Sequence, residues 1–411
     1  MASQSTEVPE NPKAGTGARS DGLSWSAKII VLAGGPMIAL AFGAILPVLP
    51  QIERALSHGP SDSFLIKQLI GVVGLSVVIG APLAGFLIDR IGVRTIVMVG
   101  CAVLCIAGTA GLYVSNIPVL VGSRLLVGAA AAAIDTTSVA IVNTRLEGNE
   151  RAKWNGLHIA LAMLTAIVLQ PIVGYIAELS WRAPFALYAL ALPIGVLGAF
   201  GLDGQRPRER TATAAGKAKA VPFLDWFPFR YAVLALIIGI ITYLPTIYGP
   251  FLMTERGAST PAAISFVLMG VSAIGGGMSM LYGRVLRDLS INATFVVALT
   301  LAAVGMLIAS VASGFTGVTI GLLVFGFGLG WFFPNIMTGL AECVAQDQQG
   351  RAVGLVRTMH DLAAPLCLVL VEPLAKRFGP VSAVMTSFSL ACALIAFFAL
   401  EMMLRKRVAA E

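Results

Sequence analysis

The feature that most constrains this chain is the length of its apolar runs. Residues 64–88 contain a single charged side chain, Lys67, and the next charge comes only at Asp89. A helix needs about 20 mostly apolar residues to cross a bilayer, so this run is long enough to span a membrane. Inside a bilayer the backbone N–H and C=O groups must be paired within the protein, which predicts that the run is an α-helix.

About twelve runs of this kind follow one another along the chain. They cover residues 27–49, 64–88, 95–114, 117–142, 157–177, 183–202, 231–253, 262–286, 291–311, 319–341, 352–374 and 381–404. Hydrophobic residues make up 57% of the sequence and charged residues 12%, against about 25% charged in a typical soluble domain. This composition excludes a soluble enzyme and predicts an all-α membrane protein with twelve transmembrane helices in two six-helix bundles. The net charge of +7 therefore does not indicate a nucleic-acid partner.

Polar stretches divide the chain into parts. Residues 25–202 and 229–404 are predicted to form an N-terminal and a C-terminal bundle, joined by a linker at residues 203–228. Residues 1–24 lack the apolar core of a signal peptide and are predicted to be a disordered tail, and residues 405–411 form a second tail. Most of the 28 lysine and arginine residues fall on one side when the tails and linker are placed there. The positive-inside rule therefore predicts a multi-pass plasma-membrane protein with cytoplasmic tails and linker.

The decapeptide GFLIDRIGVR forms a charged turn between the second and third predicted spans. It resembles the G-x-L-x-D-R-x-G-x-R loop of the major facilitator superfamily, a family of membrane transporters. The resemblance implies a gating loop, in which Asp89 and Arg90 latch the two bundles in the outward-facing state. Arg90 and Arg94 would anchor the turn at the headgroups, while Gly85 and Gly92 would permit close approach and a tight bend. The alternative is a short loop whose arginines serve topology alone.

The fourth predicted span also resembles this superfamily. It carries the pattern L-x-x-x-R-x-x-V-G-x-A-A, in which the arginine is Arg124. In related proton antiporters this arginine is associated with proton transfer, so the resemblance implies a proton-coupling role for Arg124. An arginine inside a span is costly and normally faces a cavity or a partner. The alternative is that its side chain extends to the outer interface.

Asp135 lies near the middle of the same span. It shares nearly the same helix face as Arg124 but is too far along the helix to pair with it directly. A lone acid near the bilayer centre tends to be neutral unless a cation approaches. That property suits a proton carrier or a receptor for a cationic substrate, and we predict that Asp135 takes part in proton coupling. The alternative is a packing aspartate bonded to Thr136, Thr137 or a neighbouring span.

The eleventh predicted span begins with Arg357, His360 and Asp361, which cluster on one helix face. Histidine titrates near neutral pH, and an adjacent acid and arginine can tune it. We therefore predict that His360 and Asp361 belong to a proton relay and that Arg357 lines the substrate cavity. The alternative is a structural ion pair between Arg357 and Asp361, with His360 as a bystander.

Several other side chains are candidates for the substrate cavity. Gln170 lies in the sequence A-x-x-x-Q-P-x-x-G-Y, which resembles an antiporter motif, g-x-x-x-G-P-x-x-G-G, but departs from it at two glycine positions. A buried amide needs partners, and a substrate could supply them. Tyr243 and Tyr248 in the seventh span, and Trp331 and Asn335 in the tenth, would suit an amphipathic or aromatic substrate. A packing or membrane-interface role is an equal alternative for each aromatic residue.

These features predict a secondary active transporter that works by alternating access. The resemblance to the drug:proton antiporter branch implies proton-coupled efflux of a small amphipathic organic compound. Alternatives are a proton-coupled uptake symporter for a small organic solute or anion, with Arg124 and Arg357 as anion receptors, and a non-transporting membrane receptor. No nucleophile–base pair, metal-ligand spacing or P-loop emerges, so we expect no enzyme activity, metal site or cofactor. The expected partners are the substrate, protons and the lipid bilayer, without nucleic acid, and the expected state is a monomer.

Overall fold

The computed structural model describes residues 23–202, 228–285, 289–345 and 348–408. The predicted N-terminal tail, residues 1–24, and the predicted linker, residues 203–228, lie almost entirely outside these ranges. The predicted C-terminal tail, residues 405–411, is described only as far as Val408, and that part continues the last helix.

Every regular element in the described residues is a helix. The N-terminal half contains α1 Trp25–Gly43, η1 Leu46–Val48, α2 Leu49–Leu56, α3 Pro60–Ile91, α4 Val93–Gly108, η2 Thr109–Leu112, α5 Ile117–Arg145, α6 Gly148–Leu179, η3 Ala183–Leu190 and α7 Ala191–Gly201, where η marks a 3₁₀ helix. The C-terminal half contains α9 Phe229–Glu255, α10 Pro261–Val285, α11 Ile291–Val311, α12 Phe315–Cys343, α13 Gln349–Phe378 and α14 Val381–Val408.

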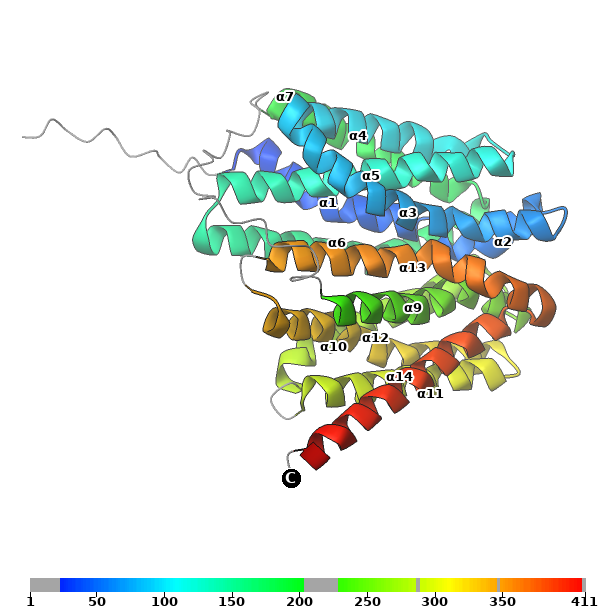
Figure 1. Cartoon of the computed structure of the whole chain (residues 1–411). Coiled ribbons are helices and arrows are strands. Elements are labelled where there is room, and N and C mark those ends of the chain that lie inside the picture. Colours follow the sequence, from blue (N-terminus) through cyan, green and yellow to red (C-terminus); the bar gives the residue numbers. More distant parts are fainter. Residues whose placement is uncertain (1–22, 203–227, 286–288, 346–347, 409–411) are drawn as a thin grey trace, which may run out of the picture.

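These helices make twelve segments that are long and apolar enough to cross a membrane. Figure 1 shows them stacked side by side, with axes that run in broadly the same direction. The first span combines α1, η1 and α2, the third combines α4 and η2, and the sixth combines η3 and α7. The predicted all-α class with twelve transmembrane helices is confirmed.

Local sequence sets where several helices begin and end. Ser24 and Asn116 cap α1 and α5, each accepting a hydrogen bond from a backbone N–H of the first turn. Pro60 and Pro261 start α3 and α10, where a helix does not need the N–H that proline lacks. Gly92, between α3 and α4, has a φ of 83°, a left-handed conformation that favours glycine. The tight bend expected at Gly92 is therefore present.

The helix ends gather at two opposite faces of the molecule. At one face α3 is followed by α4, α5 is followed by α6, and α9 begins. We call this face the basic end, because the helix ends and turns there carry Arg90, Arg94, Arg145, Arg151 and Lys153. The other face, called the opposite end, holds the turns from α2 to α3, from α9 to α10 and from α13 to α14.

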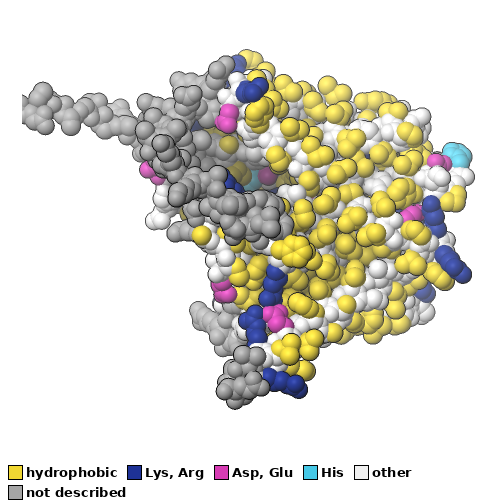
Figure 2. Space-filling model, in the orientation of Figure 1, with side chains coloured by type: hydrophobic (Ala, Val, Ile, Leu, Met, Phe, Trp, Pro, Cys, Tyr) yellow, Lys and Arg dark blue, Asp and Glu magenta, His cyan; other side chains and the backbone are white. Residues whose placement is uncertain are grey.

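The surface between the two ends is largely apolar (Figure 2). Phe200 is 88% exposed and Met280 is 85% exposed, and many other large apolar side chains point outward. Monomeric soluble proteins rarely expose apolar patches of such extent to water. In a bilayer these side chains meet lipid tails instead, which is consistent with the spans that the sequence predicts.

Glycine lets the two halves approach closely along two pairs of helices. A Cβ atom on Gly74 of α3 would lie 2.9 Å from the backbone oxygen of Asp361 on α13, so a larger residue would force these helices to shift. On the second pair, a Cβ atom on Gly174 of α6 would lie 2.6 Å from the Cβ atom of Ser265 on α10. The first contact lies near the middle of its helices, and the second lies near the opposite end. Small residues at helix crossings are typical of membrane bundles.

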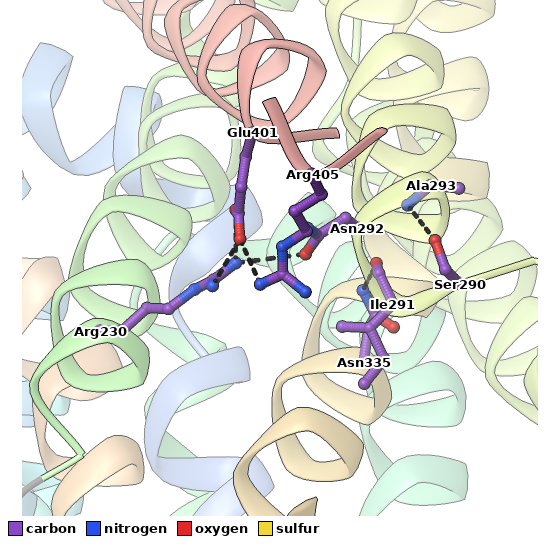
Figure 3. A network of polar contacts seen from close by, with 8 residues as sticks. All are labelled: Arg230, Ser290, Ile291, Asn292, Ala293, Asn335, Glu401 and Arg405. Carbon is purple, nitrogen blue, oxygen red and sulfur yellow. Dashed lines mark hydrogen bonds and ion pairs between the residues drawn. The ribbon is translucent and has the colours of Figure 1, made fainter. Parts of the chain in front are cut away.

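A polar network ties the C-terminal half together at the basic end (Figure 3). Arg230, at the start of α9, donates hydrogen bonds to both oxygens of Glu401 on α14, at 2.9 and 2.8 Å. The same guanidinium donates to Asn292 Oδ1 on α11 at 3.2 Å. Arg405, one turn further along α14, donates to Glu401 at 2.6 Å. Helices α9 and α14 therefore meet at one carboxylate, with α11 joined through Arg230.

Replacing Glu401 by glutamine should lower the melting temperature of the purified protein in detergent. Hydrogen bonds between charged groups contribute about 1.5–3 kcal/mol, and the partial exposure of Arg230 should reduce the loss to about 1 kcal/mol. Arg405→Gln is the matched control, because its side chain is 68% exposed and removes only one arm of the network. The control should lower the melting temperature less. Equal shifts in the two variants would contradict the assignment of Arg230–Glu401 as the stabilising contact.

Candidate functional site

A cavity of about 350 Å³ lies between the two halves of the molecule. Its walls come from α1, α3 and α5 of the N-terminal half and from α13 of the C-terminal half. Three charged side chains line it, Asp135 from α5 and Arg357 and Asp361 from α13. Most of the other lining residues are apolar, namely Ile38, Val77, Val78, Ala81, Pro82, Ala132 and Val139.

The cavity lies on the basic-end side of the contacts between the halves. Its α3 residues fall between Val77 and Pro82, which follow the Gly74 contact and precede the end of α3 at the basic end. In Figure 2 the surface is hollowed toward the basic end, and charged side chains are visible in the hollow. The halves are therefore packed together beyond the cavity, toward the opposite end.

Asp135 is joined to a histidine on a neighbouring span. His158 Nε2 lies 2.9 Å from Asp135 Oδ1, and His158 Nδ1 lies 2.8 Å from the carbonyl oxygen of Val31. The His158 side chain is 8% exposed and the Asp135 side chain is 16% exposed. This arrangement connects α1, α5 and α6 and presents Asp135 to the cavity. Asp135 thus has a packing partner and also faces the space where a substrate could bind.

A second aspartate–histidine pair belongs to the C-terminal half. His360 Nδ1 lies 3.1 Å from Asp361 Oδ1, and the Tyr243 hydroxyl donates to the same oxygen at 3.4 Å. The ring of Tyr243 also packs against His360, with 5.4 Å between the ring centroids, and the ring of Phe333 does so at 6.4 Å. The structure therefore brings the two predicted relay residues together. Tyr243 contacts the pair and is not itself part of the cavity lining.

Arg357 is exposed to the cavity. In the described part of the chain, no hydrogen bond or ion pair joins it to another side chain. The structural Arg357–Asp361 ion pair, considered as an alternative from the sequence, is absent there, because Asp361 bonds to His360 and Tyr243 instead. The Arg357 guanidinium is therefore available to bind a substrate group or a carboxylate from the other half.

Arg124 is fully buried and does not reach the outer interface. Its Nη1 donates to the Tyr188 hydroxyl at 3.0 Å, and its Nη2 donates to the carbonyl oxygens of Ala107 and Gly108, at 3.1 Å each. The guanidinium carbon lies 5.2 Å from the ring centroid of Phe185. These contacts fix α5 against α4 and η3, and Arg124 is not among the residues that line the cavity. The interface alternative is therefore wrong.

An ion-pair cluster joins the two halves near the opposite end. Lys67 Nζ on α3 lies 3.6 Å from Glu372 Oε1 on α13 and 3.8 Å from Glu53 Oε1 on α2. The side chains of Lys67 and Glu372 are 10% and 6% exposed, so the charges are largely removed from solvent. Tyr248 on α9 donates a hydrogen bond to Glu372 Oε2 at 2.8 Å. Lys67 is thus a cation shared between acids of the two halves.

Two predicted cavity residues instead fasten helices within the C-terminal half. Trp331 Nε1 donates to the carbonyl oxygen of Met278 at 2.9 Å, which joins α12 to α10. Asn335 donates to the carbonyl oxygen of Ile291 at 2.9 Å and accepts a hydrogen bond from the Tyr282 hydroxyl at 2.9 Å. Neither residue lines the cavity. A polar group inside a bundle can be satisfied by the next helix as well as by a substrate, and in this structure both side chains bond to neighbouring helices.

Two further predicted cavity residues also lie elsewhere. Tyr248 belongs to the cluster near the opposite end, where its hydroxyl is occupied by Glu372. Gln170 is buried and does not line the cavity. Its Oε1 atom has no hydrogen-bond partner among the described residues, so the expectation that a substrate satisfies this amide is not met in the cavity between the halves.

The predicted gating loop is disengaged at the basic end. Asp89, Arg90 and Arg94 are exposed, and among the described residues none of them forms an ion pair. The Arg90 guanidinium lies 4.2 Å from the ring centroid of Phe86, a contact within α3. A Cβ atom on Gly85 would meet nothing within 4 Å, so the close approach expected at this glycine is absent. The loop therefore does not connect the two halves in this conformation.

The donors around the cavity suit proton transfer and charge recognition. Besides the three charged side chains, the polar lining residues are Thr136 and Thr358. Within the described ranges, no group of three or more histidine, cysteine, aspartate or glutamate side chains is placed to hold a metal ion.

Sequence reasoning missed His158, Glu372 and the role of Lys67. His158 is one of only three histidines and lies in the fifth span, which is a usable signal. Lys67 is the single charge of its apolar run, and such a charge needs a partner inside the protein. The partners could not be named from the sequence, because each lies on a distant helix.

Known proteins are similar to this sequence over most of its length. The family model described as Major Facilitator Superfamily matches residues 31–368. The quinolone resistance protein NorA of Staphylococcus aureus (strain MSSA476) is 26% identical over 333 residues, which is 79% of this chain and 84% of that protein. Multidrug resistance protein 2 of Bacillus subtilis (strain 168) is 23% identical over 346 residues, or 81% of this chain and 85% of that protein.

Solved structures share the fold at lower sequence identity. A D-xylose-proton symporter matches with a TM-score of 0.73 and 15% identity, covering 91% of this chain and 97% of that chain. The nucleoside transporter NupG matches with a TM-score of 0.71 and 11% identity, covering 91% and 99%. The family model that spans most of the sequence, on a fold of twelve membrane-length helices, shows that this chain belongs to the Major Facilitator Superfamily of transporters.

Proposed function

We propose that this protein is a proton-coupled exporter of small amphipathic organic compounds in the plasma membrane. The observation that carries the proposal is the cavity between the halves, which combines apolar walls with Asp135, Arg357 and Asp361. Apolar walls suit the hydrophobic part of such a compound, and a few placed charges fix its orientation. The volume of about 350 Å³ falls within the range of small-molecule sites.

The relatives support the substrate class. Their names concern resistance to quinolones and to multiple drugs. Quinolones combine a polar group with an apolar ring system. The cavity has apolar walls for the ring system and charged side chains for the polar group. Fold alone would not support this step, because one transporter fold serves many substrates.

The orientation supports loading from the cytoplasm. We place the basic end in the cytoplasm, because positively charged loops favour that side, and the linker and both tails are then cytoplasmic as well. The cavity lies on the cytoplasmic side of the Lys67–Glu372 contact, so substrate enters from within the cell. Rocking of the halves would then break that contact and bring the basic ends together. In that second state the exposed Asp89 and Arg90 would latch the halves.

Proton coupling is assigned to the two aspartate–histidine pairs. Asp135 and Asp361 line the cavity from different halves, so a proton on either one changes the charge that the substrate meets. His360 shares in the second pair. Arg124 acts at a distance, because its bonds to Tyr188 and to α4 hold the helix that carries Asp135. One chain encloses the whole cavity, and we propose the monomer as the working unit.

A second candidate function is uptake of a small organic anion together with protons. The observation that favours it is Arg357, which lines the cavity and has no ion-pair partner among the described residues, since a guanidinium binds carboxylates in a bidentate manner. The two candidates differ in the relative direction of protons and substrate, so a single flux measurement separates them.

In inside-out membrane vesicles, an acidic lumen should drive a fluorescent quinolone such as norfloxacin into the lumen. The exporter exchanges protons leaving the lumen for substrate entering it. Movement of substrate and protons in the same direction would favour the symporter. Correctly folded protein that moves no tested amphipathic compound in proteoliposomes would point to a non-transporting receptor.

Asp135→Asn should reduce gradient-driven norfloxacin transport to below about a tenth of wild type, because an amide cannot take up and release a proton. Asp62→Asn, at the start of α3 near the opposite end, makes the same chemical change outside the cavity and should transport normally. Full gradient-driven transport by Asp135→Asn would exclude the carrier role of this residue.

Lys67→Gln should favour opening of the protein at the opposite end. Removing one partner of a buried ion pair costs about 3 kcal/mol or more, and each 1.4 kcal/mol is a factor of about ten in the ratio of the two states. Labelling of Ala81→Cys in the cavity by a membrane-impermeant maleimide from the outer side, in a background without other cysteines, should rise more than about tenfold.

Lys376→Gln is the matched control for this gate. It removes the same charge near the opposite end, from a lysine that lies over the Phe64 ring at 5.9 Å and forms no ion pair with a described residue. Labelling of Ala81→Cys in the Lys376→Gln variant should equal labelling of Ala81→Cys in the protein that keeps both lysines. Unchanged labelling in Lys67→Gln, or the same increase in both variants, would show that Lys67 does not hold the halves together.

A further inference from the structure

The hydrogen bonds of His158 fix where its protons must lie. A peptide carbonyl oxygen can only accept a hydrogen bond, so the contact of 2.8 Å between His158 Nδ1 and Val31 places a proton on Nδ1. The other nitrogen, Nε2, lies 2.9 Å from Asp135 Oδ1. Two bare lone pairs would repel at that distance, so one of these two atoms carries a proton.

The same proton count holds whichever atom carries that proton. If Nε2 carries it, the pair is an imidazolium and a carboxylate, and if Oδ1 carries it, the pair is an imidazole and a carboxylic acid. The pair has no net charge in either case. When the proton leaves for water in the cavity, only an N–H or O–H bond breaks, and the pair acquires one negative charge at the cavity wall. His158 and Asp135 therefore share one proton and act as one unit.

Packing holds the imidazole in this position. A Cβ atom on Gly34 of α1 would lie 2.9 Å from His158 Cε1, so α1 passes directly against the ring. The Ser138 hydroxyl, also close to Gly34, donates to backbone carbonyl oxygens and does not compete for Nε2. With its ring wedged between α1 and α5, His158 keeps Nδ1 on Val31 and Nε2 on Asp135.

Two charged groups outside the unit, Arg357 and Asp361 on α13 of the other half, line the same cavity. Asp361 is bonded to His360 and to the Tyr243 hydroxyl. Helix α1 contributes the Val31 carbonyl, and its residue in the cavity lining, Ile38, is apolar. The α3 residues that line the cavity are also apolar. Helix α10 packs along α6, and its Tyr282 hydroxyl is bonded to Asn335.

Arg357 makes the proton affinity of the unit depend on the arrangement of the halves. A deprotonated Asp135–His158 unit attracts a guanidinium, whereas the neutral, protonated unit does so far less. Arg357 is on the other half, lines the same cavity, and has no ion-pair partner among the described residues. Any movement of one half against the other changes the distance between the charge and the unit, and by linkage a change in protonation shifts the halves.

We propose that Asp135 and His158 form one proton-binding site and that Arg357 couples its protonation to the movement of the halves. This inference rests on the proposed proton-coupled transport, and it adds His158 as the residue that positions and shares the transported proton. Asp135 and His158 hold the proton together, and Arg357 is the counter-charge that the deprotonated site meets across the cavity.

Nitrogen NMR of protein labelled with ¹⁵N-histidine tests the site without any substrate. The chain has three histidines, so the signals of His58, His158 and His360 can be assigned with single His→Gln variants. From roughly pH 5 to 8, where histidine ordinarily titrates, Nδ1 of His158 should stay protonated while the Nε2 signal changes. In Asp135→Asn the pH-dependent change at Nε2 should be lost. A bare Nδ1, or an unchanged Nε2 titration in Asp135→Asn, would overturn the shared site.

Arg357→Gln tests the counter-charge in the same measurement. The midpoint pH of the His158 Nε2 change should move, because the unit loses the charge that it senses from the other half. Arg377→Gln removes an arginine from the far end of the same helix and should leave the midpoint in place. A midpoint unchanged by Arg357→Gln would remove Arg357 from the proposal.

Transport assays then connect the site to function. In proteoliposomes with one pH unit across the membrane, one-for-one exchange sustains about a tenfold norfloxacin ratio in wild type, since one unit is a tenfold proton ratio. His158→Gln should keep counterflow, which needs no gradient, and lose the gradient-driven accumulation. His58→Gln, at an exposed position near the opposite end, should keep both.

The two arms separate failure of the inference from failure of the proposed function. Wild-type accumulation by His158→Gln would overturn the role of His158 while leaving proton-coupled export intact. Wild type that moves norfloxacin in neither assay would count against the proposed export, and the NMR titration alone would then decide whether Asp135 and His158 share a proton.

Discussion

A polar group inside a bilayer has no water to bind, and this constraint governs both the backbone and the interior side chains of the protein. The described membrane segments are helical throughout, so their backbone N–H and C=O groups are paired within the helices. Arg124 shows how a side chain meets this constraint, because the Tyr188 hydroxyl and two carbonyl oxygens accept from its guanidinium. Residues held in this way join helices of one half. They make each half a unit that can move without exposing its own charges to lipid.

Contacts between the halves are of a different kind. They include glycine crossings at Gly74 and Gly174 and the shared cation Lys67. A crossing made by small residues can slide, and an ion pair can be exchanged for another one. Among the described residues Arg357 has no ion-pair partner, and Asp135 is bonded to His158 within the N-terminal half. The structure thus separates groups that are bonded within one half from groups that lie between the halves.

Much of the fold and part of the site could be predicted from the sequence. Apolar length alone identifies the spans, because a bilayer imposes it, and Asp135 and Asp361 stand out as acids in apolar surroundings. Their placement around one cavity is as the transporter hypothesis requires. The structure gives Trp331, Asn335 and Tyr248 partners within the protein. The sequence shows that such a side chain needs a partner but not whether a neighbouring helix provides it. For the same reason the His158–Asp135 and Lys67–Glu372 pairs became visible only with the helices in place.

The contact of Gly74 with the Asp361 backbone has a geometric consequence for any movement of the two halves. If the halves rock about this crossing, it acts as a pivot, and displacement grows with distance from it. Asp361 sits at the pivot and hardly travels. Arg357 is four residues closer to the basic end, about 6 Å along the helix at a rise of about 1.5 Å per residue, and it swings on a longer lever arm. One turn of α13 would therefore carry an acid, Asp361, that stays in place and a cation, Arg357, that moves.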